Sequence, residues 1–422
     1  MAGFLNARLG ELRLNEVSDE RQRRGRRWHI GQLLRVMLVG LLSERKSLAG
    51  IEKLTSEMSD AMRKMLKIPR RVADTTLRDW VCGVNIDALR ALLHRLTLLA
   101  HRRKAIAPVG LPFGVIAMDG KSTAIKAWDD NHAQRNHNEE TGHIYGLLRT
   151  ITVCLTSALA KPCIDVLPIP SATNEMGFFA DAFASVCKTY DKLFTLVTYD
   201  AGAASEANAA TVVAARKHYL LHIKNEAQHM LQYMRDNLFK DHQVKAETIE
   251  TLSNKSTVKR TLRMAQVAFI EGSSLMWSHT RTALCVTSTT TDKDGKQIAT
   301  DTRYFVCSLA DTGLKPEQWL LVVRSHWAVE NNLHHTLDAA MREDDHPFIT
   351  YDPKGAMAVC VLRRIACSLL ALFRSVTLRS ENNKKTPWRD LMRSIYNTLI
   401  AATEQHIARL RLRETSDDIV TV

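Results

Sequence analysis

Hydrophobic residues recur at helical spacing through the first hundred positions. The runs IGQLLRVMLVGLLSERK, LAGIEKLTSEM and DALRALLHRLTLLAHRRK place apolar side chains three and four residues apart, which predicts three helices. Between the last two, IPRRVADTTLRDWV offers a proline break and then Asp74 as the predicted N-cap of a short helix. Thr75, Thr76 and Arg78 on that helix fit a helix-turn-helix DNA reader, and an ordinary bundle helix fits the same pattern.

The pattern changes after residue 108, where Pro108, Gly110, Pro112 and Gly114 indicate a linker. GVIAMDG then reads as a short buried strand that ends at Asp119. The strands LRTITVCLTSA, KPCIDVLPI, LFTLVTYD and YLLHIK follow, with helices predicted at 174–190 and over SEANAATVVAARK. Three strands followed by alternating helices and strands predict a mixed sheet with helices on both faces.

Residues 240–312 are β-like again, with KDGK as a turn between the last two strands, which predicts a β-rich insertion. Helices return with KPEQWLLVVRSHWAVENNLHHTLDAAMRED and continue to residue 413. The predicted fold class is therefore α/β: a mixed sheet flanked by helices, with an N-terminal all-helical domain. The predicted boundaries are a helical basic domain at 1–108, a first core part at 109–239, the insertion at 240–312 and a last core part at 313–422.

Composition adds limits to this picture. With 45% apolar and 24% charged residues over 422 positions, the chain is typical of a globular protein. We find no run of 18 apolar residues and no secretory signal, so we expect no membrane span and a cytoplasmic location. The eight cysteines form no C-x-x-C pair and lie in apolar runs, which favours buried free thiols over disulfides or a zinc site.

The net charge of +13 is unevenly distributed. Residues 1–110 hold 22 Lys and Arg against 11 Asp and Glu, which indicates a polyanionic partner, most economically DNA. An acidic protein or a membrane surface would also suit a basic composition. The run RQRRGRR is typical of either a solvated charge run or a phosphate contact. The arginines that we predict to bind DNA from this region are Arg23, Arg24, Arg26, Arg27, Arg70, Arg71 and Arg78.

Three acidic residues are the candidate chemistry. Asp119 and Asp200 each end a predicted buried strand, and ligands of open α/β sheets gather outside the carboxyl ends of strands. At about 100° per residue, Glu330 shares a helix face with Trp327 and Leu337, where a buried carboxylate needs a cationic partner. Two Mg²⁺ ions held by these acids would support in-line displacement at phosphorus. Purely structural carboxylates are the alternative.

Several motifs in consistent order resemble one known family. They are SDERQRRGRRWHIGQLLRVMLVGLL, IAMDGKS, SATNEMGFF, TYDAGAASEANAATVVAARKHYLLHIKNEAQ, RYFVCSL and VVRSHWAVENNLHHTLDAAMREDD. Together they resemble the H-repeat-associated (ISAs-type) DDE transposases of bacterial insertion sequences. This resemblance implies a ribonuclease-H-like fold, with the insertion before the helix that carries the catalytic glutamate.

The resemblance also implies a site and partners. Asp119, Asp200 and Glu330 would be the catalytic triad and would bind two Mg²⁺ ions, for which Mn²⁺ would substitute. The partners would be double-stranded DNA, as transposon ends and target, and further copies of the chain in a homodimer or higher multimer. Such a protein acts in the bacterial cytoplasm, associated with the nucleoid.

The chain departs from the larger class around the glutamate. That class has a tyrosine seven residues before it, an arginine four before and a lysine seven after, where this chain has Val323, His326 and Leu337. His326 is therefore either a phosphate contact or a structural histidine. Arg324 is a further candidate for DNA binding, about 120° around the predicted helix from Glu330.

Four more residues are candidates for DNA binding. Lys121 lies two residues after Asp119 and is either a phosphate contact or a solvated strand end. Lys224, Asn225 and Gln228 match a Lys, Asn, Gln run of the family at the end of the last core strand. His326, Glu330 and His334 share a helical spacing that could suggest zinc, but the H-E-x-x-H pattern is absent.

The expected function is DNA transposition: Mg²⁺-dependent cleavage at transposon ends and transfer of the 3′-hydroxyl into target DNA. A catalytically silent or domesticated DNA-binding protein of the same fold is the alternative. A general nuclease, which would cut without preference for ends, is a third possibility.

Overall fold

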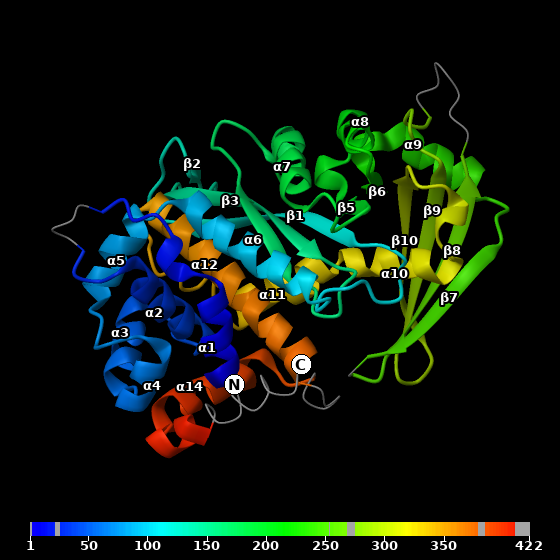
Figure 1. The fold of residues 1–422 in the computed structure, drawn as a ribbon. Coiled ribbons are helices and arrows are strands. Elements are labelled where there is room, and N and C mark those ends of the chain that lie inside the picture. Colours follow the sequence, from blue (N-terminus) through cyan, green and yellow to red (C-terminus); the bar gives the residue numbers. More distant parts are fainter. Residues whose placement is uncertain (1, 22–25, 253, 268–274, 379–384, 410–422) are drawn as a thin grey trace.

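The computed structural model describes residues 2–21, 26–252, 254–267, 275–378 and 385–409. One ten-stranded mixed sheet runs through the molecule, with helices on both faces (Figure 1). The strand order is β2-β3-β1-β5-β6-β10-β9-β8-β7, and β4 pairs with β3. The strands are β1 (Val115–Ile125), β2 (Ala133–His137), β3 (Ile144–Leu155), β4 (Cys163–Pro168), β5 (Leu196–Tyr199), β6 (His218–Ile223), β7 (Val244–Thr251), β8 (Thr257–Gln266), β9 (Thr282–Thr291) and β10 (Gln297–Cys307).

The central part of the sheet follows the predicted order of elements. β1, β3 and β4 are antiparallel neighbours, whereas β5 and β6 run parallel to β1. The parallel strands are reached through α7 (Glu175–Tyr190) and α8 (Glu206–Ala214), which lie above the sheet in Figure 1. The first four residues of β1 are fully buried, as expected for a strand with helices on both faces.

The predicted β-rich region is confirmed as strands, but it does not form a separate sheet. β10 pairs antiparallel with β6, so β7 to β10 continue the central sheet to its far edge. The KDGK turn between β9 and β10 is confirmed, and Gly295 at its tip has φ 82, a value that favours glycine.

The first hundred residues are helical, as predicted. The helix α5 has an exposed face with Thr75 and Arg78 and a buried face with Leu77 and Trp80. The helices are α1 (Ala2–Glu11), α2 (Ile30–Leu42), α3 (Leu48–Glu57), α4 (Asp60–Leu66), α5 (Asp74–Gly83) and α6 (Ile86–Arg102).

The prediction that Asp74 caps α5 is wrong, because Ala73 occupies the N-cap and Asp74 is the first helical residue. The backbone N–H of Asp74 instead donates to Glu52 Oε2 at 3.1 Å, which ties the start of α5 to α3. The exposed Thr75 and Arg78 suit a DNA reader, and the packed inner face suits a bundle helix, so both interpretations of α5 stand.

The C-terminal helix α12 (Pro353–Leu372) packs among the N-terminal helices, against α6, α2 and α5, and also against β4. Gly355 permits the contact with α5, because a Cβ there would lie 2.8 Å from the Cys82 sulfur. α14 (Trp388–Ala401) contacts α1 and α2. The first and last parts of the chain therefore share one core.

The segment Pro353–Thr377 bears on the expectation that the chain has no membrane span. Among the described residues it is the one helix long and apolar enough, by length and composition, to cross a membrane. Its most apolar window is entirely buried inside the protein, where it serves as the central core helix.

The eight cysteines are free, as predicted, and six of them are buried. Burial raises the pKa of the Cys154 thiol to about 12, so this side chain behaves as a small apolar residue rather than as a nucleophile.

The predicted continuous helix at 315–344 is broken in the structure. α10 (Pro316–His326) ends at Trp327, a π-helical turn covers Val329–His334, and α11 (His335–Ala339) follows. We call Val329–His334 the Glu330 turn. α10, α11 and α12 lie below the sheet in Figure 1, on the opposite side from α7 and α8.

Candidate active site

Asp119 and Asp200 lie side by side on neighbouring strands. β1 and β5 are parallel, and Met118 is the register partner of Tyr199, so the two aspartates are one step further along adjacent strands. Side chains at matched positions of neighbouring strands point to the same face of a sheet. The predicted proximity of the two acids agrees with this register, but the prediction that the strand ends at Asp119 is wrong, because β1 continues to Ile125.

Glu330 does not occupy the buried, apolar position that the sequence predicts. Its side chain is exposed and lines a cavity of about 480 Å³ together with Asp200. The expected face assumed regular α-helical rotation, whereas a π-helix bonds each residue to one five positions away and shifts the faces of the helix. The carboxylate consequently opens onto a polar cavity instead of entering the core.

Asp119 is the most perturbed acid in this region. It is 9% exposed, and burial raises its pKa from 3.8 to about 8, assisted by the negative charges of Glu330, Glu175 and Asp200. A hydrogen bond from the backbone of Gly120 acts in the opposite direction but does not outweigh them. Four carboxylates from separate elements are thus close enough to repel one another.

Glu175 was not among the residues predicted from the sequence. It begins α7, after the N-cap Asn174, and its Oε1 accepts a hydrogen bond from the Tyr199 hydroxyl at 2.8 Å. Gly120 makes room for it, because a Cβ at that position would fall 1.9 Å from Glu175 Oε2. An acid directly after a capping asparagine is the signal that could have identified it, since helix N-termini favour negative charge.

Asp200 is contacted by a lysine and a histidine. Lys224 Nζ lies 3.1 Å from Asp200 Oδ2, and His222 Nδ1 lies 3.0 Å from Oδ1. Lys224 and Asn225 line the same cavity as Asp200 and Glu330, and so does Arg303, whose guanidinium lies 4.4 Å from the Trp327 ring centroid. The cavity therefore presents both carboxylates and cations.

Two histidines lie near the acids: His326 is buried and His334 is half-buried. Burial lowers the pKa of His326 to about 4, and its Nδ1 lies 2.9 Å from Thr198 Oγ1. His334 Nδ1 lies 3.4 Å from Asp119 Oδ2, and burial, followed by the positive charges of Arg364 and Lys121, lowers its pKa to about 3. The contact between His334 and Asp119 is therefore made by a neutral ring and is not an ion pair. His326 has the surroundings of a structural histidine.

The remaining core residues that we predict to contact DNA differ in their exposure and in their partners. Lys121 is not a solvated strand end, because its side chain is 8% exposed and paired with Asp338 and Asp344. Arg324 is exposed, pairs with Glu250 on β7 and lines a cavity together with Glu330. Gln228 is exposed at the start of α9 (Gln228–Tyr233).

The predicted N-terminal contacts are spread over the surface of the helical region. Arg23 and Arg24 lie outside the described residues. Arg26 is exposed and donates to backbone oxygens of Asp19 and Arg21, and Arg27 is exposed. The other three are Arg70, which lies 5.0 Å from the Trp28 ring centroid, Arg71, which pairs with Glu52, and the exposed Arg78.

The acids do not form a closed coordination shell as they stand. Over the described ranges, no three His, Cys, Asp or Glu side chains are grouped so that they could hold a metal ion. Their chemistry nevertheless suits a hard divalent cation: the donors are carboxylate oxygens, and Asp119 sits in an excess of negative charge. Coordination would require the exposed Glu330 to turn inward and Asp200 to release Lys224.

Comparisons with known proteins add little to this picture. No protein-family model matches the chain, and no curated protein matches it. One solved structure that matches is the cryo-EM structure of the piggyBac transposase synaptic complex with hairpin DNA. The match has a TM-score of 0.44 and 12% sequence identity, and covers 100% of this chain and 81% of that chain. A likeness this distant assigns neither a fold nor a function.

Proposed function

We propose that this protein is a DNA transposase that cleaves transposon ends in the presence of Mg²⁺ and transfers the resulting 3′-hydroxyl to target DNA. The observation that carries the proposal is the crowding of Glu330, Glu175 and Asp200 around the buried Asp119, whose pKa rises to about 8. A bound divalent cation would relieve the repulsion among these acids and hold them ionised.

The order of the central strands supports a ribonuclease-H-like core. Three antiparallel strands, β4, β3 and β1, are followed by β5 and β6, which run parallel to β1 and lie on its other side. Asp119 on the central strand and Asp200 after its neighbour then flank one point of the sheet, and the Glu330 turn contacts β1 and β3.

In this proposal Asp119, Asp200 and Glu330 would hold the metal. Bound Mg²⁺ would activate the attacking oxygen and stabilise the leaving oxygen during displacement at phosphorus, and Mn²⁺ would substitute for it. Lys224 and Arg303 line the cavity beside these acids and would contact phosphate oxygens. Asn225, on the same cavity wall, would orient the DNA strand.

The basic N-terminal helices would bind the duplex, since residues 1–110 carry most of the net positive charge. We include in the proposal a homodimer that brings two transposon ends together. We also propose that the protein acts in the bacterial cytoplasm, where its DNA substrate lies.

The test is cleavage of DNA that carries the repeats flanking the gene, with Mg²⁺ or Mn²⁺, by the parent protein and by Asp119→Asn. We expect the substitution to reduce cleavage by roughly a thousandfold or more while DNA affinity changes less than about threefold. Asp294→Asn, the same change on the exposed β9–β10 turn, is the matched control and should cut normally.

Three other results would contradict the proposal. DNA binding without cutting by the parent would indicate a silent DNA-binding protein. Cutting without preference for the repeats would indicate a general nuclease. Equal cutting by the parent and Asp119→Asn would remove the acid cluster from the reaction.

A further inference from the structure

Two elements that carry candidate metal ligands also carry a pair of opposite charges. On β1, Lys121 lies two residues after Asp119 and so on the same face of the strand. On the opposing helical segment, Glu330, His334 and Asp338 follow one another at intervals of four residues. Asp119 therefore faces the Glu330 turn, and Lys121 faces Asp338 in α11.

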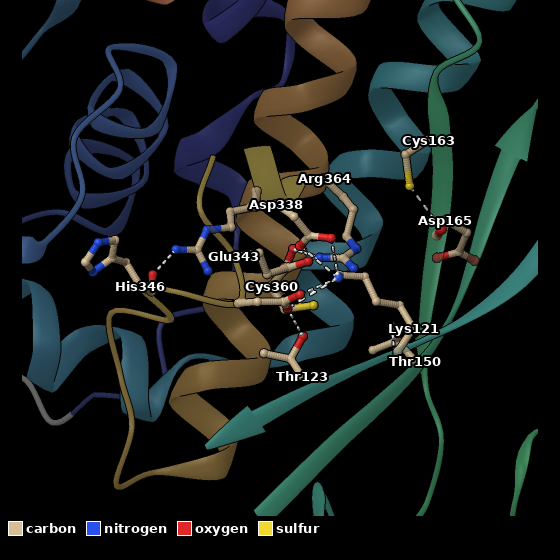
Figure 2. Close-up of polar contacts among 12 residues, drawn as sticks. Lys121, Thr123, Thr150, Cys163, Asp165, Asp338, Glu343, His346, Cys360 and Arg364 are labelled. Atoms are coloured by element: carbon tan, nitrogen blue, oxygen red, sulfur yellow. Dashed lines mark hydrogen bonds and ion pairs between the residues drawn. The ribbon is translucent and has the colours of Figure 1, made fainter. Parts of the chain in front are cut away.

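The Lys121 ammonium is held by carboxylates. Its Nζ lies 2.8 Å from Asp338 Oδ1 and 3.0 Å from Oδ2, and 3.3 Å from both oxygens of Asp344 (Figure 2 shows the Lys121 and Asp338 side chains). Thr123 Oγ1, on the same strand, donates to Asp344 at 3.2 Å. Burial opposes the charge on Lys121, but the bonds to Asp338 and the nearby acids outweigh it and hold its pKa above the ordinary value.

The ion pairs of Lys121 provide an attractive contact between β1 and the segment that follows the Glu330 turn. The Glu330 turn packs against β1 and β3, and the charges of Asp119 and Glu330 oppose each other whenever both acids are ionised. The contact from the neutral His334 ring to Asp119 is long, at 3.4 Å, and supplies little. Lys121 follows Asp119 along β1, and Asp338 follows His334 along the helical segment, so their ion pair lies beside the acids. The Lys121 side chain is buried in this pair.

The acidic partners of Lys121 are anchored in turn. Glu343, next to Asp344, forms a buried ion pair with Arg364 of α12 (Figure 2). Arg363 donates to the backbone oxygen of His346 in the same loop. The segment after α11 is therefore fixed to the core helix before it meets Lys121.

We propose that Lys121 is a positioning residue that clamps α11 to β1 through Asp338 and thereby holds the Glu330 turn against the strand that carries Asp119, from where Glu330 could turn toward a metal ion. The inference rests on the proposed metal-dependent function. It replaces a direct phosphate contact as the role of Lys121, because the ammonium already makes two ion pairs.

The test measures Mn²⁺ binding directly, by calorimetry on the DNA-free protein, together with DNA affinity at fixed salt. We expect Lys121→Met and Asp338→Asn each to weaken Mn²⁺ binding about tenfold, as loss of supporting contacts at metal sites commonly does. DNA affinity should stay within about twofold of the parent, and the double variant should be no worse than either single variant. Lys121→Arg, which keeps the charge, should retain most of the Mn²⁺ affinity.

The matched control is Lys126→Met, which removes an exposed lysine of the same region whose ammonium bonds the Tyr351 hydroxyl. It should leave Mn²⁺ binding unchanged. Should Lys121→Met fail to fold, Asp338→Asn and Lys121→Arg still decide the matter.

Different failures are distinguishable. Normal Mn²⁺ affinity with a lowered melting temperature in both clamp variants would reduce the pair to a structural role and overturn the inference. Weakened DNA binding in Lys121→Met but not in Asp338→Asn would restore the phosphate contact and also overturn it. A parent protein that binds no Mn²⁺ would overturn the proposed function itself, and the clamp with it.

Discussion

Two groups of charges lie next to each other on opposite sides of His334, and they are balanced differently. Around Asp119 three further acids, Glu330, Glu175 and Asp200, outnumber the cations, and burial and repulsion raise the pKa of Asp119 to about 8. A few residues away, Lys121, Arg363 and Arg364 face three acids, Asp338, Glu343 and Asp344. We call the first group the acid cluster and the second the paired cluster.

The two clusters differ in whether the protein's own side chains neutralise their negative charge. In the paired cluster, burial raises the pKa of Glu343, but the charges of Arg364 and Arg363 and the bond to Arg364 hold it below the ordinary value. The fold thus supplies its own counter-charges where they stabilise structure. In the acid cluster it leaves negative charge around Asp119, which is the condition that a divalent cation would relieve.

Disruption of the paired cluster should have the largest effect on the stability of the protein. Arg364→Met leaves Glu343 buried without its partner, so we expect the free energy of unfolding to fall by about 3–5 kcal/mol in a urea titration. Arg364→Met combined with Glu343→Gln removes both charges and should recover part of the loss. A single variant as stable as the parent would show that the ion pair does not hold α12 to the loop.

The acid cluster should instead make the metal-free protein sensitive to pH. The folded pKa of Asp119, about 8, lies above its ordinary value of 3.8, so folding favours the protonated acid. Its contribution to stability is full below about pH 4 and is lost as pH rises toward 8. Between pH 5 and 8 we expect a loss on the order of 3 kcal/mol, which Asp119→Asn should remove.

Urea titrations of both proteins across this pH range, with a chelator present, provide the measurement. Saturating Mn²⁺ should reduce the pH-dependent loss in the parent, because a bound cation stabilises the ionised acid. Parallel pH profiles for parent and variant would mean that Asp119 is ionised in the folded protein.

The sequence predicts the parts of the fold that depend on local pattern. Helices α2, α3, α5 and α6, the central strands and β7 to β10 follow from the sequence pattern, and the proximity of Asp119 and Asp200 follows from two buried runs that end in acids. That β10 joins β6 is not predictable in this way, because it depends on pairing between distant segments.

The sequence misses features that depend on local geometry and distant partners. Regular rotation of 100° per residue predicts a buried Glu330, whereas the π-helical turn exposes it. Glu175 becomes part of the acid cluster only because Gly120, 55 positions earlier, has no side chain. Lys121 reads as a solvated strand end until Asp338, 217 positions later, is brought to it.

Glu330→Gln should give the smallest change in stability, and it tests directly whether Glu330 acts on the pKa of Asp119. Because the side chain is exposed, we expect the free energy of unfolding to change by less than about 0.5 kcal/mol at pH 5. The charge of Glu330 is the largest influence on the pKa of Asp119 after burial, so its removal should lower the folded pKa of Asp119, and the pH-dependent loss of stability should end at a lower pH. With less repulsion Asp119 ionises at a lower cost in free energy, and the total loss of stability across the pH range becomes smaller.

The control is Glu317→Gln, which changes an exposed acid at the start of α10 and should leave the pH profile unchanged. An unchanged profile in Glu330→Gln would mean that the two carboxylates do not sense each other, and the acid cluster would lose the member that links it to the cavity.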